Sequence, residues 1–232
     1  MHAADDVLLT GGSGLLGTEI LKICAGIHAP TRHQMDITDH DQCKKIIHEI
    51  NPKVIIHAAA LTSPPICETE SKKARNTNIL GTLNILNICE EKSIKLVYIS
   101  TDYVFDGNKG NYSINDAINP VNKYAMTKAS AELAVKTYDN SLIIRTSFCQ
   151  NQFPYEKAFV DQYTSRDYVD ILAKHILSAS LSSKKGIIHI GTERKTVYDL
   201  AKRRKPNVGK LSIKDVNFNA PKDTSLRINQ SE

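Results

Sequence analysis

The chain has 232 residues, 41% hydrophobic and 24% charged, which allows one large core with or without a smaller lobe. The net charge of +5 is modest, and the longest apolar stretches are far too short to span a bilayer. The five cysteines are scattered and none lies in a CxxC pair, which argues against a disulfide framework or a zinc site and suits a reducing cytoplasm.

The start of the chain favours a protein of the cytoplasm, and its most basic run does not indicate a nucleic-acid-binding protein. The first six residues lead directly into a strand-like segment, without the basic and apolar regions of a secretory signal. The basic run at residues 202–205 is interpreted as the solvated end of a helix, where positive charge complements the helix dipole. Because no aromatic residues interleave with it, as stacking on bases would require, we do not expect nucleic acid as a partner. The short apolar stretches likewise predict no membrane partner.

Short β-branched runs alternate with helical patterns over residues 6–147. Strands are predicted at 6–10, around Ile27, and at 53–57, 96–100 and 142–145. Helices are predicted at 15–25, 39–50, 71–91 and 121–138, the second opened by a capping-box pattern of Asp39 and Gln42. Near-continuously apolar strands separated by helices indicate a doubly wound α/β fold of the Rossmann type, with a parallel sheet covered on both faces.

The pattern changes after Ser147. Residues 149–161 show no clear period, and a helix at 168–180, a strand at 186–190 and a helix at 196–204 with Thr196 as N-cap follow. From Pro206 onward we expect mostly loop. We therefore predict a Rossmann domain over residues 1–147 and a small, shortened C-terminal lobe over residues 148–232.

A glycine-rich loop joins the first predicted strand to the first predicted helix. Gly11, Gly14 and Gly17 are spaced three apart, as a turn needs when it tolerates positive φ, lets a pyrophosphate approach the backbone and packs the helix on the strand. The helix N-terminus adds free N–H groups for the phosphates. The flanking strand and helix favour a dinucleotide-binding loop over a tight structural turn. The remaining contacts of this loop are expected from Ser13, Leu15 and Leu16.

The GxxGxxG spacing resembles the extended short-chain dehydrogenase/reductase superfamily, and three further segments are similar to it. In residues 35–39 the resemblance implies adenine contacts from Asp36 and Ile37. In the small-residue strand end at 57–60 it implies close backbone approach of the cofactor at Ala58, Ala59 and Ala60. In residues 77–82 it implies a structural asparagine, Asn78, which we group with the cofactor-binding residues.

The choice between the two nicotinamide dinucleotides depends on the segment after the second strand. NAD enzymes usually carry an acid there for the ribose 2′-hydroxyl. Residues 27–32 contain no acid, but they contain Arg32, and an arginine can pair with a 2′-phosphate. We predict NADP(H), with NAD(H) as the alternative. An ordinary surface role for Arg32 stays open.

Tyr124 and Lys128 stand at i and i+4 on a predicted helix, so they share one face. A nearby ammonium lowers the pKa of a tyrosine, which would make Tyr124 a usable general acid. Lys128 is also expected to hold the nicotinamide ribose. Thr101 follows a buried strand at its carboxyl end, where catalytic groups of this fold lie. By the family resemblance, Thr101 takes the place of the catalytic Ser/Thr that hydrogen-bonds the substrate carbonyl.

The string STDYVFDG at residues 100–107 is the most specific in the chain and resembles the dTDP-4-dehydrorhamnose reductase family. The resemblance implies NADPH-dependent reduction of the C4 ketone of a nucleotide-linked 4-keto-6-deoxy sugar, as in dTDP-rhamnose biosynthesis. It implies that Asp102 and Val104 line the sugar site, and also Phe148, where the family usually has tryptophan. Homodimers are common in that family, and the sequence shows no metal-binding cluster.

Three other functions compete with this one. A 4,6-dehydratase needs an acid/base pair that follows the catalytic threonine as Asp-Glu, and here Tyr103 follows Asp102. A C4 epimerase uses the same Thr-Tyr-Lys set and stays open. The alternative from another class is an NADP-binding regulatory subunit similar to the β-subunit of methionine adenosyltransferase, which the shortened C-terminal lobe keeps open.

Overall fold

The computed structural model describes residues 3–216 and 221–228. Its centre is a five-stranded parallel sheet with the spatial order β1-β2-β3-β4-β9. The strands are β1 (Val7–Thr10), β2 (Val54–His57), β3 (Lys95–Thr101), β4 (Ser141–Thr146) and β9 (Gly186–Ile190). Every residue of the first four is buried, as expected for parallel strands covered on both faces.

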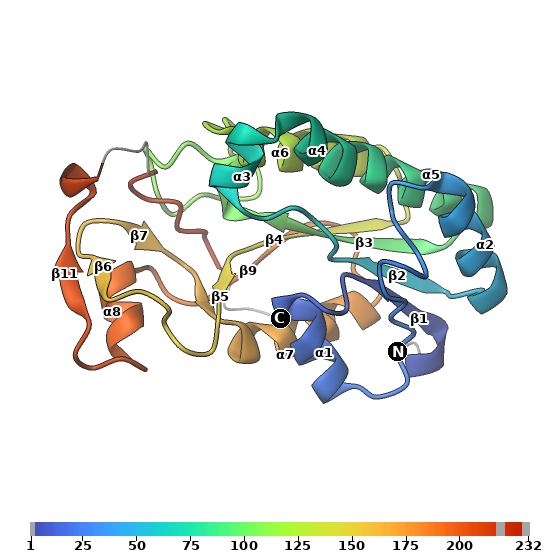
Figure 1. Ribbon diagram of the computed structural model, residues 1–232, viewed down its shortest axis with the longest axis horizontal. Helices are drawn as coiled ribbons and strands as arrows, with labels where there is room; N and C mark the ends of the chain where they lie inside the picture. The colour runs from blue at the N-terminus through green and yellow to red at the C-terminus, as the bar shows by residue number, and fades with distance from the viewer. Residues whose placement is uncertain (1–2, 217–220, 229–232) are drawn as a thin grey trace.

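Helices cover both faces of this sheet (Figure 1). On one face lie α2 (His40–Ile50), α5 (Gly81–Lys92) and α6 (Lys123–Val135), and on the other α1 (Leu15–Ile23) and α7 (Val169–Leu181). This arrangement confirms the predicted doubly wound α/β fold.

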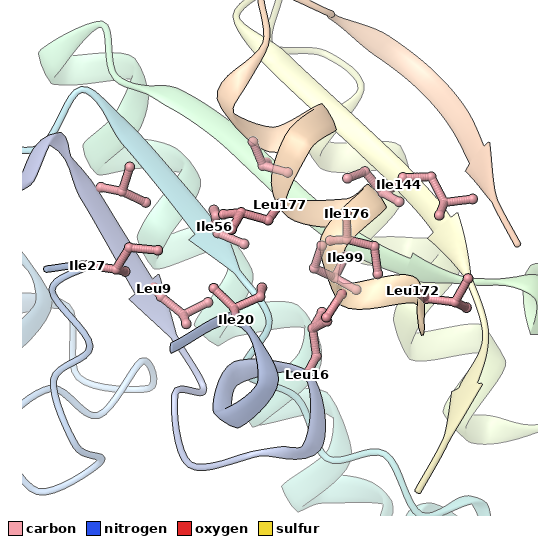
Figure 2. Close-up of a cluster of buried hydrophobic side chains, with 14 of the residues drawn as sticks. Leu9, Leu16, Ile20, Ile27, Ile56, Ile99, Ile144, Leu172, Ile176 and Leu177 are labelled. Carbon is pink, nitrogen blue, oxygen red and sulfur yellow. The ribbon is translucent and has the colours of Figure 1, made fainter. Parts of the chain in front are cut away.

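The core beneath α1 and α7 is aliphatic (Figure 2). Each of the strands β1 to β4 contributes two residues, among them Leu9, Ile56, Ile99 and Ile144. Leu16 and Ile20 from α1 and Leu172, Ile176 and Leu177 from α7 pack on them. Because α7 and β9 follow residue 147 yet complete this core and sheet, the expected boundary at residue 147 does not separate the layers of the fold.

The rest of the C-terminal half forms a small lobe, at the left of Figure 1. It contains α8 (Val197–Lys202) and three two-stranded pairings, β5-β8, β6-β11 and β7-β10. These strands are β5 (Phe148–Cys149), β6 (Lys157–Phe159), β7 (Tyr163–Thr164), β8 (Asp167–Tyr168), β10 (Lys195–Thr196) and β11 (Gly209–Leu211). Strand β11 and a 3₁₀ turn, η4 (Ile213–Asp215), lie where we expected loop.

Local capping explains where several helices begin. Asp39 accepts a hydrogen bond from Gln42 N at 3.0 Å and caps α2. The Gln42 side chain bonds Asp36 N instead of returning to Asp39, so the expected capping box is only half formed. Thr196 caps α8 in a complete capping box with Asp199, as a helix starting here requires.

One predicted strand is much shorter in the structure, and one predicted helix contains a π-helical turn. The strand expected around Ile27 is a single bridge between Leu8 and His28, because Pro30 follows closely and lacks the N–H that a longer ladder needs. The long helix expected at 71–91 is α4 (Ser71–Arg75), a π-helical turn η2 (Asn76–Leu80) and α5, preceded by an unexpected α3 (Pro64–Thr69).

The chain order creates a switch point between β1 and β2. After β1 the chain runs to the bridge at His28, on the outer side of β1, and then returns to β2 on the other side. Ligands of doubly wound sheets bind in the crevice at the carboxyl ends of such strands. The same edge receives the ends of β3 and β4, so all the predicted site segments converge there.

Candidate active site

A cavity of about 680 Å³ lies at this edge of the sheet. Its walls contain almost all of the predicted site residues. On the cofactor side they are Gly11, Ser13, Gly14, Leu15, Leu16, Gly17, Arg32, Asp36, Ile37, Ala58, Ala59 and Ala60. On the other side they are Thr101, Asp102, Tyr124, Lys128 and Phe148. Asn78 and Val104 do not line it.

The glycine loop is packed so tightly that side chains cannot fit. Gly11 has a φ of +75°, and a Cβ there would come within 2.8 Å of Ala59 N. A Cβ on Gly17 would collide with the carbonyl oxygen of Gly11. The loop therefore needs glycine at position 11 for its backbone conformation and its approach to the end of β2, and glycine at position 17 for the packing of α1 against the loop.

This loop fits the pyrophosphate of a nicotinamide dinucleotide. Helix α1 starts at Leu15, has no acidic residue in its first turn, and uses Gly14 as N-cap without a side-chain cap. The first N–H groups of a helix lack intrahelical partners and attract phosphate. Farther along the wall, Arg32 Nε lies 3.0 Å from Asp36 Oδ2. This pair occupies the place expected for the adenosine end of the cofactor.

Asn78 supports the cavity from behind. Its Oδ1 accepts from Leu61 N at 2.7 Å, and its Nδ2 donates to Leu61 O at 3.1 Å and to Thr127 Oγ1 at 2.9 Å. The π-helical turn that carries Asn78 therefore fixes the segment after Ala60 against α6. Asn78 has the structural part of its expected role, but no position on the cavity wall.

A buried histidine that sequence analysis did not single out links these segments. His57 Nδ1 lies 2.7 Å from Thr10 Oγ1, and its Nε2 lies 3.0 Å from Thr82 Oγ1. Thr82 donates to Asn78 O at 2.8 Å, so it accepts from His57, which assigns the proton to Nε2. Burial, aided by the charge of Lys128, lowers the pKa of His57 to about 3. His57 is therefore neutral.

Thr101, Tyr124 and Lys128 converge where β3 meets α6. Asn122 caps α6 by accepting from Ala125 N at 2.8 Å, which starts the helix one turn before Lys128. Tyr124 hydrogen-bonds Thr101. Because Tyr124 and Lys128 are four residues apart on α6, they share one face of this helix. Thr101 lies at the end of β3 beside that face, and the three side chains form the predicted cluster.

The electrostatics of this cluster differ from the expectation. Lys128 is 4% exposed, donates to Ile99 O at 2.8 Å and lies 4.0 Å from the centre of the Tyr98 ring. Burial lowers the pKa of Lys128 to about 7, against the opposing charge of Glu132. Burial also raises the pKa of Tyr124, although the hydrogen bond with Thr101 lowers it. The expected lowering of the Tyr124 pKa is therefore not met, because burial outweighs the groups that lower it.

The expectation that Val104 lines the sugar site is not met. Asp102–Val104 form a 3₁₀ turn, η3, in which successive side chains point about 120° apart. Tyr103 therefore lines the cavity, while Val104 is fully buried in a cluster with Phe105 and Tyr112.

Arg166 is a cavity residue that sequence analysis missed. It lies in the turn between β7 and β8, and its Nε donates to Ser147 Oγ at 2.9 Å. Burial lowers the pKa of Arg166, but Tyr103 and Asp102 raise it, and the net shift is upward. The residue follows a segment without clear periodicity, so only the fold brings it to the site.

Other features bear on the class of protein. The five cysteines are free thiols. Arg203, Arg204 and Lys205 of the basic run pair with acidic side chains. Within residues 3–216 and 221–228, no helix has the length and apolarity to cross a membrane, and no cluster of His, Cys, Asp or Glu suits a metal ion.

Comparisons with known proteins agree with this geometry. The curated dTDP-4-keto-6-deoxy-D-glucose reductase of Streptomyces niveus is 30% identical over 222 residues, covering 85% of this chain and 77% of the relative. The dTDP-4-dehydrorhamnose reductase of Aggregatibacter actinomycetemcomitans is 32% identical, covering 73% and 61%. Methionine adenosyltransferase 2 subunit beta of Rattus norvegicus is 33% identical over 140 residues, covering 56% of this chain but only 42% of that subunit.

Among solved structures, the dTDP-4-dehydrorhamnose reductase of Bacillus anthracis in complex with NADP superposes with a TM-score of 0.88. It is 28% identical, and the match covers 96% of this chain and 90% of that one. The family model described as the RmlD substrate binding domain matches residues 5–178. These matches confirm the resemblance predicted from residues 100–107, and the chain belongs to the RmlD substrate binding domain family.

Proposed function

We propose that this protein is an NADPH-dependent reductase that converts the C4 ketone of a nucleotide-linked 4-keto-6-deoxy sugar into an alcohol. The observation that carries the proposal is the meeting of Thr101, Tyr124 and Lys128 in a cavity whose other half is the glycine loop. The two curated reductases named above support the substrate class. The five free thiols suit work in the cytoplasm.

NADPH, when bound, supplies the hydride. The glycine loop at residues 11–17 would hold its pyrophosphate, and Asp36 and Ile37 its adenine. The side chains of Ala58, Ala59 and Ala60 are small, so the cofactor could approach the backbone there. Arg32 lines the cavity beside Asp36 and favours a 2′-phosphate, and the NADP complex of the Bacillus anthracis reductase supports this preference.

The proton that the reduction needs comes from a side chain of the protein. Thr101 and Tyr124 are placed to donate hydrogen bonds to the substrate carbonyl, and Tyr124 gives its proton to the developing alkoxide. Because burial raises the pKa of Tyr124, the phenol keeps its proton at neutral pH, as a general acid must. Lys128, one turn further along α6 on the cavity wall, would hold the nicotinamide ribose.

The substrate side of the cavity is built by both halves of the chain. Asp102, Tyr103 and Phe148 follow β3 and β4, and Arg166 comes from the small lobe. The Phe148 ring offers an apolar face for the sugar, and Arg166 offers a cation for an anionic nucleotide. We assign the described part of the small lobe, residues 148–168, 191–216 and 221–228, to substrate binding.

The test is NADPH oxidation by the purified protein against a panel of nucleotide-linked 4-keto-6-deoxy sugars, with NADH in parallel. Turnover is expected with NADPH and lost in Tyr124→Phe, which should still bind NADPH. Tyr198→Phe is the matched control, because Tyr198 lies on α8 outside the cavity. Full turnover by Tyr124→Phe would overturn the proposed role.

The similarity to methionine adenosyltransferase 2 subunit beta supports a second candidate, an NADP-binding regulatory subunit. The presence of all three proposed catalytic groups counts against it, because a binding protein has less need of them. Tight NADPH binding without turnover of any sugar in the panel would favour the regulatory function.

A further inference from the structure

A buried strap from the C-terminal end of the chain passes beside the active site. We define the C-terminal strap as residues 221–227. Asp223, Thr224, Ser225 and Leu226 are at most 8% exposed, which is unusual for three polar residues in a row. The strap lies between the loop after β3 and the rest of the small lobe: Asp223 N donates to Gly107 O at 2.9 Å, and Thr224 N to Tyr163 O at 3.2 Å.

Thr224 reaches the active site through Asp102. Its Oγ1 donates to Asp102 Oδ2 at 2.8 Å. The other carboxyl oxygen, Oδ1, lies 3.2 Å from Thr101 Oγ1. Asp102 is 1% exposed, so its carboxyl forms a buried link between the strap and the proposed catalytic threonine.

The hydroxyl of Thr101 has one proton to donate and two lone pairs to accept with. One lone pair accepts from Tyr103 N at 3.2 Å. The single proton has two acceptors within reach, the carboxyl of Asp102 and the phenol oxygen of Tyr124. Thr101 can therefore donate its hydrogen bond to Tyr124 or to the substrate carbonyl only when Asp102 does not accept it.

The charge of Asp102 decides between the two acceptors. An ionised carboxylate is the stronger acceptor and binds the Thr101 proton. A protonated carboxyl instead donates its own O–H to Thr101 Oγ1, and the Thr101 proton becomes available to Tyr124 or to a substrate carbonyl. The two arrangements therefore differ by one proton bound to Asp102 and by the direction of its hydrogen bond with Thr101.

Burial favours the protonated state of Asp102. It raises the pKa of the carboxyl, while the charge of Arg166 and hydrogen bonds from Thr224, Thr101 and Ser147 lower it, and the net shift is upward. Arg166 faces Asp102 from the turn before β8, Tyr103 from its own turn, and Tyr124 from α6. On the strap, Asp223 is turned away and pairs with Arg194.

We propose that Thr224 is a positioning residue of the reaction: through Asp102 it sets the direction in which Thr101 donates its proton, and Asp102 is protonated in the productive state. This inference rests on the proposed reductase function. It extends the active site to the strap, which belongs to a part of the chain where we expected mostly loop.

The first test compares pH profiles of kcat. Thr224→Val removes the hydrogen-bond donor with little change of shape. Because that hydrogen bond stabilises the ionised carboxylate of Asp102, its loss should raise the pKa of Asp102. The high-pH limb of the profile, where kcat falls as Asp102 ionises, should therefore move up by about one pH unit. Thr224→Ser keeps the donor and should restore the original profile. Asp102→Asn is uncharged at all pH and can donate to Thr101, so it should lose this limb. A merely structural role would lower kcat at every pH and leave the limb in place, which would overturn the proposal.

The second test does not depend on turnover. The C=O band of protonated Asp102, identified as the infrared band missing from Asp102→Asn, is titrated in the cofactor-free protein. Its midpoint should rise by about one pH unit in Thr224→Val and stay unchanged in Thr224→Ser. An unmoved midpoint would overturn the inference whatever the turnover. A moved midpoint without turnover of any sugar would instead refute the reductase function and leave the link between Thr224 and Asp102 standing.

Discussion

Arg145 on β4 donates two hydrogen bonds to one carboxylate oxygen of Glu132 on α6, from Nε at 3.0 Å and from Nη2 at 2.6 Å. The other oxygen of Glu132 accepts from Ser100 Oγ at 2.5 Å. Glu132 lies one turn beyond Lys128, and Ser100 directly precedes Thr101. The pair therefore ties the helix that carries Tyr124 to the strand that carries Thr101.

The first prediction concerns this buried pair, whose side chains are 4% and 2% exposed. Glu132→Ala should lower the free energy of unfolding by about 3–5 kcal/mol, because it leaves a buried guanidinium without its counterion. Urea denaturation measures the loss. In the double variant Glu132→Met/Arg145→Met the loss of stability should be smaller than the sum of the losses in Glu132→Met and in Arg145→Met. Additive losses would show that the two side chains do not stabilise each other.

The second prediction concerns His57 and acid pH. Its pKa is about 3 in the folded protein and near 6.5 in an unfolded chain. Between these values the unfolded chain binds a proton that the folded protein does not, so the stability present above pH 6.5 is lost as the pH falls. The slope should approach 1.4 kcal/mol per pH unit, about 2 kcal/mol between pH 6.5 and pH 5.

Urea denaturation at pH 5 and pH 7 measures this effect. In His57→Gln the difference between the two pH values should shrink by about 2 kcal/mol, because the titrating group is gone. The matched control is His48→Gln, since His48 is exposed on α2, and it should keep the wild-type difference. An unchanged difference in His57→Gln would show that His57 does not cause the acid sensitivity.

Local sequence signals were sufficient for the parts of the site that depend on short spacing. The glycine loop needs a strand, a turn and a helix that are adjacent in the chain, and Gly11 and Gly17 stand where backbone packing leaves no room for a side chain. Tyr124 and Lys128 share a helical face through their i, i+4 spacing. Such features can be predicted from the sequence because residues that are close in the chain determine them.

Sequence signals failed where the tertiary structure decides which way a side chain faces. Val104 belongs to the string that identified the family, yet a 3₁₀ turn directs it into the core. Arg166 and Thr224 reach the site from segments without periodicity, and their partners Ser147 and Asp102 are distant in the chain. No local pattern could reveal these contacts, because the fold creates them.

The third prediction tests Arg32 as the group that distinguishes NADPH from NADH. Arg32→Ala should weaken NADPH binding by about tenfold, the low end for a hydrogen bond to a charged group, and leave NADH binding almost unchanged. Calorimetry with each cofactor measures both constants. Arg75→Ala is the matched control, because Arg75 is exposed on α4 and does not line the cavity. An equal loss for both cofactors would assign Arg32 to the shared part of the dinucleotide.

The fourth prediction tests Arg166 as the cation for the substrate nucleotide. Arg166→Met keeps much of the side-chain volume and removes the charge, so KM for the sugar nucleotide should rise by about tenfold or more. The Kd for NADPH should not change, because Arg166 lies on the substrate side, beside Ser147 and Tyr103. Steady-state kinetics at saturating NADPH measure the first quantity and calorimetry the second.

Arg166→Lys serves as the control for charge, since it keeps the cation and loses the fork of donors that reaches Ser147. A KM intermediate between wild type and Arg166→Met would show that both charge and geometry contribute. If Arg166→Met leaves KM unchanged and instead shifts the pH profile of kcat upward, Arg166 acts on the protonation of Asp102, whose pKa its charge lowers, and the nucleotide must be bound by other residues.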